Sequence, residues 1–224
     1  MTQFKEFPAT KQSIGQRKPI YGVGINDSPY IVTPVIDGKK LWCPYYQTWV
    51  NMMARCYSDK HKKKYPTYIG CSVIKEWRLF SSFRRWMVTQ DWQGKQLDKD
   101  ILVVGNKVYS PENCMFVTMA TNNLVLDGST IRGEYPQGVH FSRERGKYVA
   151  QCNNSAKRTP LGRFDTMAEA ELAYLRFKIF VLTKVSNESE AVNNPRLQAA
   201  LLRHTKLFMD KAAHIENRMN NKLQ

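Results

Sequence analysis

Residues 136–178 read PQGVHFSRERGKYVAQCNNSAKRTPLGRFDTMAEAELAYLRFK, and this stretch decides the fold of the C-terminal half. Three short runs with alternating apolar and polar residues predict three β-strands, at 138–143, 147–153 and 158–164. Thr166 then stands three residues before Glu169, which is the spacing of a capping box at a helix start. An apolar stripe at helical spacing follows it. The stretch therefore predicts a small three-stranded antiparallel sheet covered by one helix.

The same stretch resembles the plant ethylene-response-factor (APETALA-type) DNA-binding domain, which is also found appended to phage HNH proteins. The landmarks of that domain occur in order as Gly138-Val139, Lys147-Tyr148-Val149-Ala150, Leu161-Gly162-Arg163-Phe164-Asp165-Thr166, Glu169-Ala170 and Ala173-Tyr174. The resemblance implies that residues 138–185 form a sheet that fits the major groove of duplex DNA, with the helix against its back. The plant domains carry a tryptophan in the sheet that this chain lacks, so their base specificity does not transfer.

Basic and amide side chains of the predicted sheet are the candidate DNA contacts. Arginine forks onto guanine, lysine mainly holds phosphate, and glutamine or asparagine reads adenine from an outward face. These residues are Arg143, Arg145, Lys147, Gln151, Asn153, Lys157, Arg158 and Arg163. The residues predicted to pack the sheet on Ala170, Ala173 and Phe177 are Val149, Cys152, Leu161 and Phe164. The alternative for the arginines is a charged edge that discourages aggregation.

The composition also favours a polyanionic partner. The chain of 224 residues has 34 Lys and Arg against 19 Asp and Glu, a formal net charge of +15. Such a surplus suits double-stranded DNA, because each cation that meets a phosphate releases a counterion. RNA is a less favoured alternative, since a basic sheet does not exclude A-form targets. No stretch approaches the roughly 20 apolar residues that a membrane-spanning helix needs.

The termini and cysteines suggest where the protein works. The first residues, MTQFKEF, lack the apolar core of a signal peptide. The five cysteines, at 43, 56, 71, 114 and 152, form no C-x-x-C pair. We therefore expect a cytoplasmic protein, in the host cytoplasm if a phage encodes it, with reduced cysteines that serve mostly as small core residues.

Upstream, residues 97–123 read LDKDILVVGNKVYSPENCMFVTMATNN, preceded at 70–87 by GCSVIKEWRLFSSFRRWM. Over about residues 42 to 123, this ordered set resembles the HNH nuclease signature of phage and intron-encoded endonucleases. Asp98-Lys99 falls on the family's Asp-His pair, Pro111–Thr118 on its middle segment, and Asn122-Asn123 on its closing helix. The resemblance implies an α+β fold in which a helical lead-in precedes a ββα-metal block.

The resemblance also implies roles for single residues. Asp98 and Asn122 match the metal ligands, for Mg²⁺ or Mn²⁺, which prefer oxygen donors. Asn113 matches the residue that orients the general base, and Asp100 is a spare carboxylate that joins the metal or holds Lys99. Lys99 departs from the family, because histidine accepts a proton near neutral pH whereas a lysine ordinarily has a pKa of about 10.4.

Two functions therefore stay open. One is a metal-dependent DNA endonuclease of nicking or homing type, with Asp98, Lys99, Asp100 and Asn113 at its centre. The other is a catalytically inactive DNA-binding protein, a regulator or host-factor blocker, that keeps the nuclease fold. Neither the target site nor the oligomeric state follows from the sequence.

The remaining segments complete the expected organisation. Residues 1–41 read as an extended arm with one hairpin, 42–127 as the nuclease-like domain, 128–137 as a linker, and 186–224 as an amphipathic helix for core packing or dimerisation. Helices are predicted at Tyr45–Tyr57 and Lys75–Val88. Asp59–Lys64 is predicted to be a loop, either solvated or in contact with phosphate. The further candidate DNA contacts in these segments are Lys62, Lys63, Arg84 and Arg85.

Overall fold

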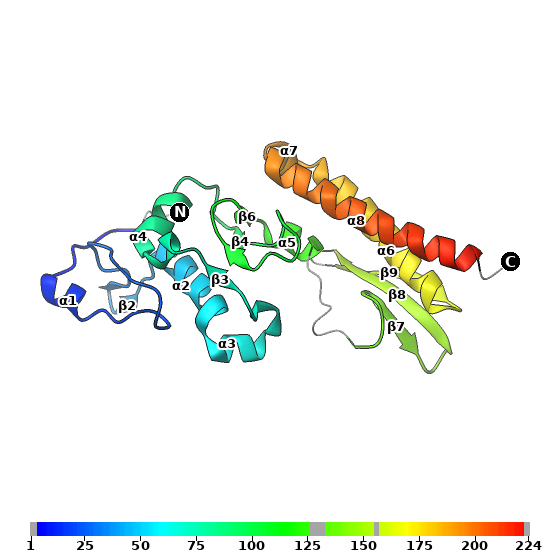
Figure 1. Ribbon diagram of the computed structural model, residues 1–224, viewed down its shortest axis with the longest axis horizontal. Helices are drawn as coiled ribbons and strands as arrows, with labels where there is room; N and C mark the ends of the chain where they lie inside the picture. Colours follow the sequence, from blue (N-terminus) through cyan, green and yellow to red (C-terminus); the bar gives the residue numbers. More distant parts are fainter. Residues whose placement is uncertain (1–3, 126–132, 155–156, 222–224) are drawn as a thin grey trace. The chain divides into compact units, whose positions relative to one another are not determined.

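The computed structural model describes residues 4–125, 133–154 and 157–221 (Figure 1). The fold is mixed α+β, with several small sheets among the helices. The chain divides into two compact units, Met1–Phe116 and Val117–Gln224. Most of the predicted linker, 128–132, lies outside the described residues. No described helix is both long enough and apolar enough to cross a membrane.

Two helices form the core of the first unit. α2 (Pro44–Tyr57) confirms the predicted helix, and its buried face includes Trp49 and Met53. α4 (Phe80–Met87) is shorter than predicted, because Leu79 is extended and separates it from a 3-10 turn, η2 (Glu76–Arg78). The indole Nε1 of Trp49 donates a hydrogen bond of 2.7 Å to the carbonyl of Trp77, which ties α2 to this turn.

The N-terminal segment contains the predicted hairpin. Strands β1 (Val35–Ile36) and β2 (Lys39–Lys40) pair antiparallel, and α1 (Lys11–Gly15) precedes them. The two turn residues, Asp37 and Gly38, have φ angles of 50° and 73°. These are the left-handed conformations that a two-residue type I′ hairpin turn requires.

The same segment is not the extended arm that we predicted. Tyr30 and Val32 are buried in the core of the first unit. The guanidinium of Arg17 donates to the carbonyls of Asn26, Ser28 and Tyr30 at 2.9, 2.6 and 3.0 Å. These bonds satisfy backbone groups of an irregular segment, so it packs as part of the unit. Residues on both sides of position 41 belong to the same compact unit, Met1–Phe116.

The predicted loop at Asp59–Lys64 is in fact a short helix, α3. Ser58 caps it, since its hydroxyl accepts a hydrogen bond of 3.3 Å from the backbone N–H of His61. Asp59 adds a negative charge in the first turn, which a helix N-terminus favours. A 3-10 turn, η1 (Pro66–Tyr68), follows it. The lysine run and Pro66 obscure this cap in the sequence.

Short strands hold the segment between α4 and the second unit. β3 (Ser72–Val73) pairs in parallel with β5 (Val108–Tyr109), and β4 (Gln96–Asp98) pairs with β6 (Met115–Val117). α5 (Met119–Val125) then opens the second unit. The block that resembles the HNH signature thus contributes to both units.

The second unit contains the predicted sheet and helix. β7 (Val139–Ser142), β8 (Lys147–Asn154) and β9 (Lys157–Phe164) form an antiparallel sheet in that order. α6 (Met167–Ser186) begins with the predicted capping box. The hydroxyl of Thr166 accepts from the N–H of Glu169 at 3.2 Å, and the Glu169 carboxylate accepts from the N–H of Thr166 at 3.0 Å.

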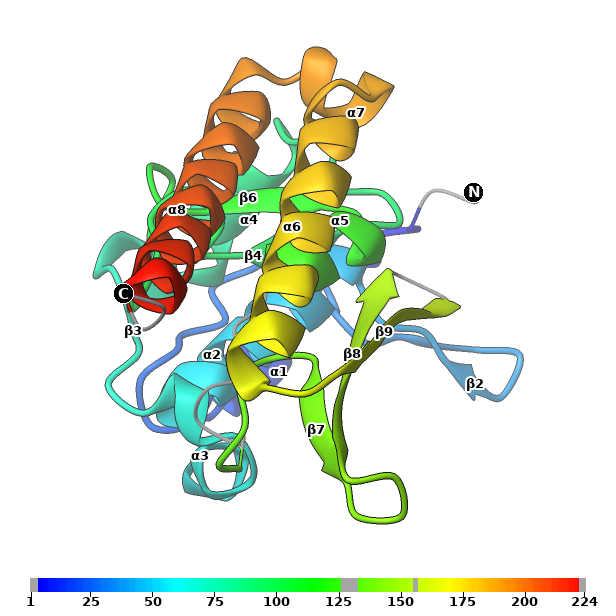
Figure 2. The same ribbon diagram turned by 90° about the vertical axis from the view of Figure 1, so that its right-hand side faces the viewer.

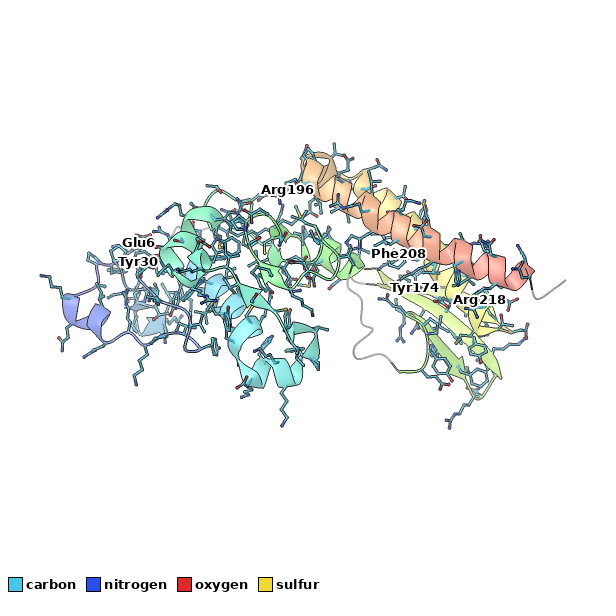
Figure 3. The ribbon with its side chains drawn as sticks, in the orientation of Figure 1. Glu6, Tyr30, Tyr174, Arg196, Phe208 and Arg218 are labelled. Carbon is cyan, nitrogen blue, oxygen red and sulfur yellow. The ribbon has the colours of Figure 1, made fainter. Side chains whose placement is uncertain are left out.

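The C-terminal helix belongs to the same unit. α7 (Ser189–Val192) makes the turn, and α8 (Pro195–Asn220) runs beside α6 in both views (Figures 1 and 2). Tyr174 of α6 is buried in their shared core, and Phe208 of α8 packs against it (Figure 3). Of the two roles predicted for this helix, the structure shows core packing. All five cysteines are buried free thiols, as expected.

Candidate nucleic-acid interface and nuclease-like loop

The sheet of the second unit has an inner and an outer face. Val139, Ala150 and Cys152 are buried toward α6. Because successive residues of a strand point to opposite faces, the residues between them point away from the helix. The register pairs Val149 with both His140 and Arg163, and Gln151 with Pro160. The outer face therefore carries His140, Ser142, Lys147, Val149, Gln151, Arg158, Pro160 and Arg163.

One prediction for this sheet is wrong. The sequence predicts Val149 on the inner face, but this residue alternates with the buried Ala150 and lies half-exposed on the other side. The sequence reasoning also missed His140 and Pro160 as outer-face residues. Alternation from Val139 would have placed His140, whereas Pro160 is placed only by its pairing with Gln151 in the structure. Asn153 and Lys157 lie on β8 and β9, but their side chains are outside the described part of the chain.

The outer face is positively charged. Arg158 and Arg163 are exposed, and so are Arg143 and Arg145 in the turn between β7 and β8. Lys147 differs from these arginines, because its ammonium forms an ion pair with Asp165. The four arginines of the sheet and its β7–β8 turn are thus accessible to a large ligand, whereas Lys147 is already paired.

A glycine allows the sheet to start close to α6. Gly138 has a φ of +76°, and a Cβ built there would lie 2.2 Å from the ring of Tyr174 and 2.5 Å from the carbonyl oxygen of Gln151. The N–H of Gln151 donates to the carbonyl of Gly138 at 2.8 Å. The first strand therefore approaches the helix at a distance that only glycine permits.

In the segment 98–113, which we call the nuclease-like loop after its resemblance to the HNH signature, Asp98 closes a turn. Its Oδ1 accepts hydrogen bonds from the backbone N–H groups of Asp100 and Ile101, at 2.8 and 2.6 Å. The residue is almost fully buried, and this burial raises the pKa of its carboxyl group. The two amides oppose that change, because they stabilise the ionised form. Within the described residues, Oδ2 of Asp98 makes no hydrogen bond.

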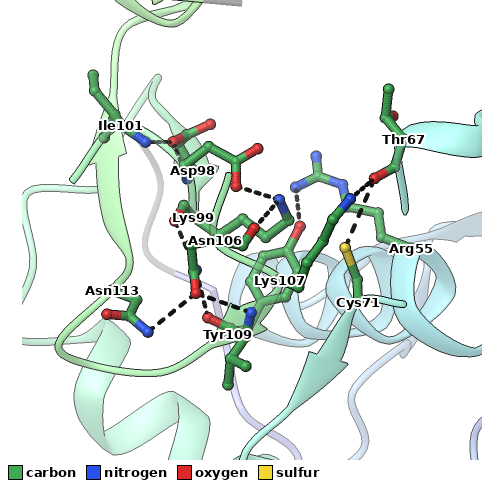
Figure 4. A network of polar contacts seen from close by, with 12 residues as sticks. Arg55, Thr67, Cys71, Asp98, Lys99, Ile101, Asn106, Lys107, Tyr109 and Asn113 are labelled. Carbon is green, nitrogen blue, oxygen red and sulfur yellow. Dashed lines mark hydrogen bonds and ion pairs between the residues drawn. The ribbon is translucent and has the colours of Figure 1, made fainter. Parts of the chain in front are cut away.

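Lys99 has polar partners inside the same loop (Figure 4). The residue is buried, and its ammonium contacts the Asp100 carboxylate and donates to the carbonyl of Asn106 at 2.8 Å. Asn106 returns a bond of 2.8 Å from its amide to the Lys99 carbonyl. The amide of Asn113 donates to Oδ1 of Asn106 at 3.3 Å.

The loop thus brings together the four predicted catalytic residues around one that the sequence reasoning missed. A chain of contacts connects them: Asp98 accepts from the N–H of Asp100, whose carboxylate contacts Lys99. Asn106 then bonds to both Lys99 and Asn113. The available signal was the Gly105-Asn106 pair, a turn dipeptide after an apolar run. In this arrangement the lysine ammonium neutralises Asp100 and braces the backbone.

The predicted metal ligands do not form a complete site in the first unit. Asn122 lies on α5 in the second unit, so its pairing with Asp98 stays a prediction. Among the described residues, no three or more His, Cys, Asp and Glu side chains are grouped to hold a metal ion. Mg²⁺ needs several oxygen ligands. The donors gathered around Asp98 do not by themselves fit such an ion.

The remaining candidate DNA contacts lie on α3 and α4. The guanidinium of Arg84 forms an ion pair with Glu6 and lies over the rings of Tyr30 and Tyr45, at 5.0 and 5.5 Å from their centroids. Arg84 is therefore part of the packing of the first unit. Arg85 is exposed, as is Lys63, while Lys62 is half-buried. No family model, curated protein or solved structure matches this chain, so both resemblances rest on the residues quoted above.

Proposed function

We propose that this protein binds duplex DNA through the outer face of the sheet β7–β9. The observation that carries the proposal is the strand register, which puts Gln151, Arg158 and Arg163 on the face that α6 does not cover. The major groove of B-DNA admits elements of β-structure, and arginine and glutamine are side chains that recognise base edges there. The resemblance to the ethylene-response-factor domain supports the same face.

The charge distribution supports a nucleic-acid partner. The outer face and the β7–β8 turn carry four exposed arginines, and the acidic residues of the same region are Glu144 and Asp165. Asp165 is already paired with Lys147. Phosphate contacts of this kind make binding depend steeply on salt. A salt-dependent affinity for duplex DNA is therefore the first expectation of the proposal.

We propose further that the nuclease-like loop serves as a folded docking element and does not hydrolyse DNA. Lys99 lies at the position where the HNH family, which this chain resembles, has its histidine. Its ammonium already contacts the Asp100 carboxylate and the Asn106 carbonyl. A cation held in this way is a poor acceptor for the proton of an attacking water. Asp98, the predicted metal ligand, uses one oxygen to close its own turn.

A metal-dependent endonuclease is the second candidate. One specific observation favours it, namely that Oδ2 of Asp98 has no hydrogen bond among the described residues. Incubation of supercoiled plasmid with the protein, in Mg²⁺, in Mn²⁺ and in EDTA, distinguishes the two candidates. We expect retarded but intact DNA in all three conditions. Nicking or linearisation that needs the metal and disappears in Asp98→Ala would instead establish the endonuclease.

A further inference from the structure

A cluster of aromatic rings lies on the surface of the first unit, at the end of α3. The His61 ring centroid is 4.9 Å from that of Tyr65 and 5.3 Å from that of Tyr68. Tyr65 is 42% exposed, so much of this ring is open to solvent. Burial is the main cause that lowers the pKa of His61, and this favours the uncharged ring. We call His61, Lys63, Lys64, Tyr65 and Tyr68 the α3 surface.

Cations surround these rings. The ammonium of Lys64 lies 5.1 Å from the ring centroid of Tyr65, and the guanidinium of Arg55 lies 5.7 Å from that of Tyr68. Lys60 and Lys63 are exposed on the same helix. The helix holds one acid, Asp59, in its first turn. The α3 surface therefore combines open aromatic area with a strong positive charge.

Two hydrogen bonds hold the backbone of η1 and of β3 next to these rings. The ammonium of Lys107 donates a hydrogen bond of 2.7 Å to the carbonyl of Thr67, inside η1 (Figure 4). Tyr57 of α2 accepts a hydrogen bond of 3.1 Å from the N–H of Val73, which follows η1 in β3. These bonds hold the backbone beside Tyr65 and Tyr68 in place, and an ordered backbone lowers the ordering cost of binding.

We propose that the α3 surface binds a single-stranded segment of DNA, with a base stacked on Tyr65 and backbone phosphates beside Lys63 and Lys64. The proposal rests on the proposed function for its ligand class and extends it, because it assigns unpaired DNA to a second site. Aromatic rings interleaved with lysines suit a single strand, since every base has a face that stacks on a ring and every linkage carries a charge. A folded duplex hides its base faces and offers only phosphates to such a surface.

The test compares two ligands and two matched tyrosines. Fluorescence anisotropy measures the affinity of a labelled thymidine oligonucleotide and of a labelled duplex for the full chain. Tyr65→Ala removes the stacking ring, whereas Tyr21→Ala removes a ring of similar exposure, 44%, elsewhere in the first unit. We expect Tyr65→Ala to weaken binding of the single strand about tenfold, because stacking on one base is worth roughly 1–3 kcal/mol. Tyr65→Phe should retain the affinity, and Tyr21→Ala should leave it unchanged.

Several outcomes would overturn the proposal. Equal effects of Tyr65→Ala and Tyr21→Ala on the single strand would exclude a stacking role for Tyr65. Poly-glutamate and unlabelled thymidine strand can be compared as competitors at equal concentrations of negative charge. If poly-glutamate displaces the labelled oligonucleotide equally well, the surface belongs to acidic peptides. Tighter binding of a uridine RNA oligomer would assign it to RNA. The same variants separate this proposal from duplex binding by the sheet. If duplex binding survives Tyr65→Ala but disappears in variants of the outer face, the duplex binds at the sheet and not at the α3 surface.

Discussion

The ammonium of Lys99 donates a hydrogen bond to the carbonyl of Asn106, and the amide of Asn106 donates one to the carbonyl of Lys99, both at 2.8 Å. This reciprocal pair fixes the two sides of the nuclease-like loop to each other. Asn106 also accepts from the N–H of Val108 at 3.1 Å, which leads the chain into β5. Lys99 is therefore a structural member of the loop, and the role of Asp98 can be tested separately from it.

Asp98→Asn should keep the fold and change how stability depends on pH. Asparagine retains the Oδ1 acceptor for the two amides and removes the buried charge. Burial raises the pKa of Asp98 in the folded state. The wild-type carboxyl group therefore contributes most to the free energy of unfolding at pH values below its unfolded pKa of about 3.9. It loses that contribution as the pH rises through its pKa in the folded state. Urea unfolding should show Asp98→Asn at least as stable as wild type at pH 7, with any gain shrinking toward pH 4. A clear loss of stability at pH 7 would mean that the ionised carboxylate is needed.

Glu190 should be important for the stability of the second unit. Its carboxylate accepts from the N–H and hydroxyl of Thr118, both at 3.0 Å, and from the hydroxyl of Thr121 at 2.7 Å. Glu190→Ala leaves these donors at the start of α5 without that partner, which costs about 2 kcal/mol or more of unfolding free energy. Denaturant unfolding measures the loss. Glu188→Ala, at an exposed glutamate nearby in the chain, is the control and should change stability by less than about 0.5 kcal/mol.

Gly138→Ala should destabilise the sheet much more than Gly146→Ala. Both glycines have positive φ, at 76° and 62°, so both variants share the cost of a left-handed alanine. Only at Gly138 does the added Cβ collide with Tyr174 and with the backbone of Gln151. We expect Gly138→Ala to lose about 2 kcal/mol more than Gly146→Ala, in line with other overpacked sites. Equal losses in thermal unfolding would contradict the close approach of β7 to α6.

The cysteines should be unreactive in the folded protein. Burial raises the pKa of Cys56 and of Cys114 to about 12, and the other three thiols are buried as well. Because only the thiolate reacts, a disulfide reagent such as Ellman's reagent should modify none of them rapidly at pH 8. After denaturation all five should react. Rapid reaction of one thiol in the native protein would show that its surroundings open.

The sequence is most informative where local rules and packing agree. The strands of the C-terminal sheet, the capping box at Thr166 and the buried face of α2 follow from alternation, cap spacing and helical periodicity, and the structure contains all three. The prediction for Val149 is wrong because it follows the apolar character of one residue and not the strict alternation of the strand. The prediction of a loop at Asp59–Lys64 is wrong because it follows composition and not the Ser58 cap.

Other features depend on contacts that are distant in the sequence. The packing of residues 4–43 on the first core uses Arg17 bonds to three carbonyls, and such bonds leave no periodic pattern. The role of Asn106 depends on the return of the chain seven residues after Lys99. Motif matching names the four candidate residues of this loop but cannot show that Lys99 and Asp100 touch each other.

The most direct test of duplex binding by the outer face compares two pairs of substitutions in the second unit. Arg158→Ala with Arg163→Ala removes two charges from the outer face, and Arg176→Ala with Lys206→Ala removes two exposed charges from α6 and α8. The first pair should bind the duplex much more weakly than the wild type does. In a salt series, the slope of log affinity against log salt concentration should decrease by about 1 for each removed arginine that binds a phosphate in the wild type. The second pair should stay close to wild type. Equal behaviour of the two pairs would contradict recognition through the outer face of β7–β9.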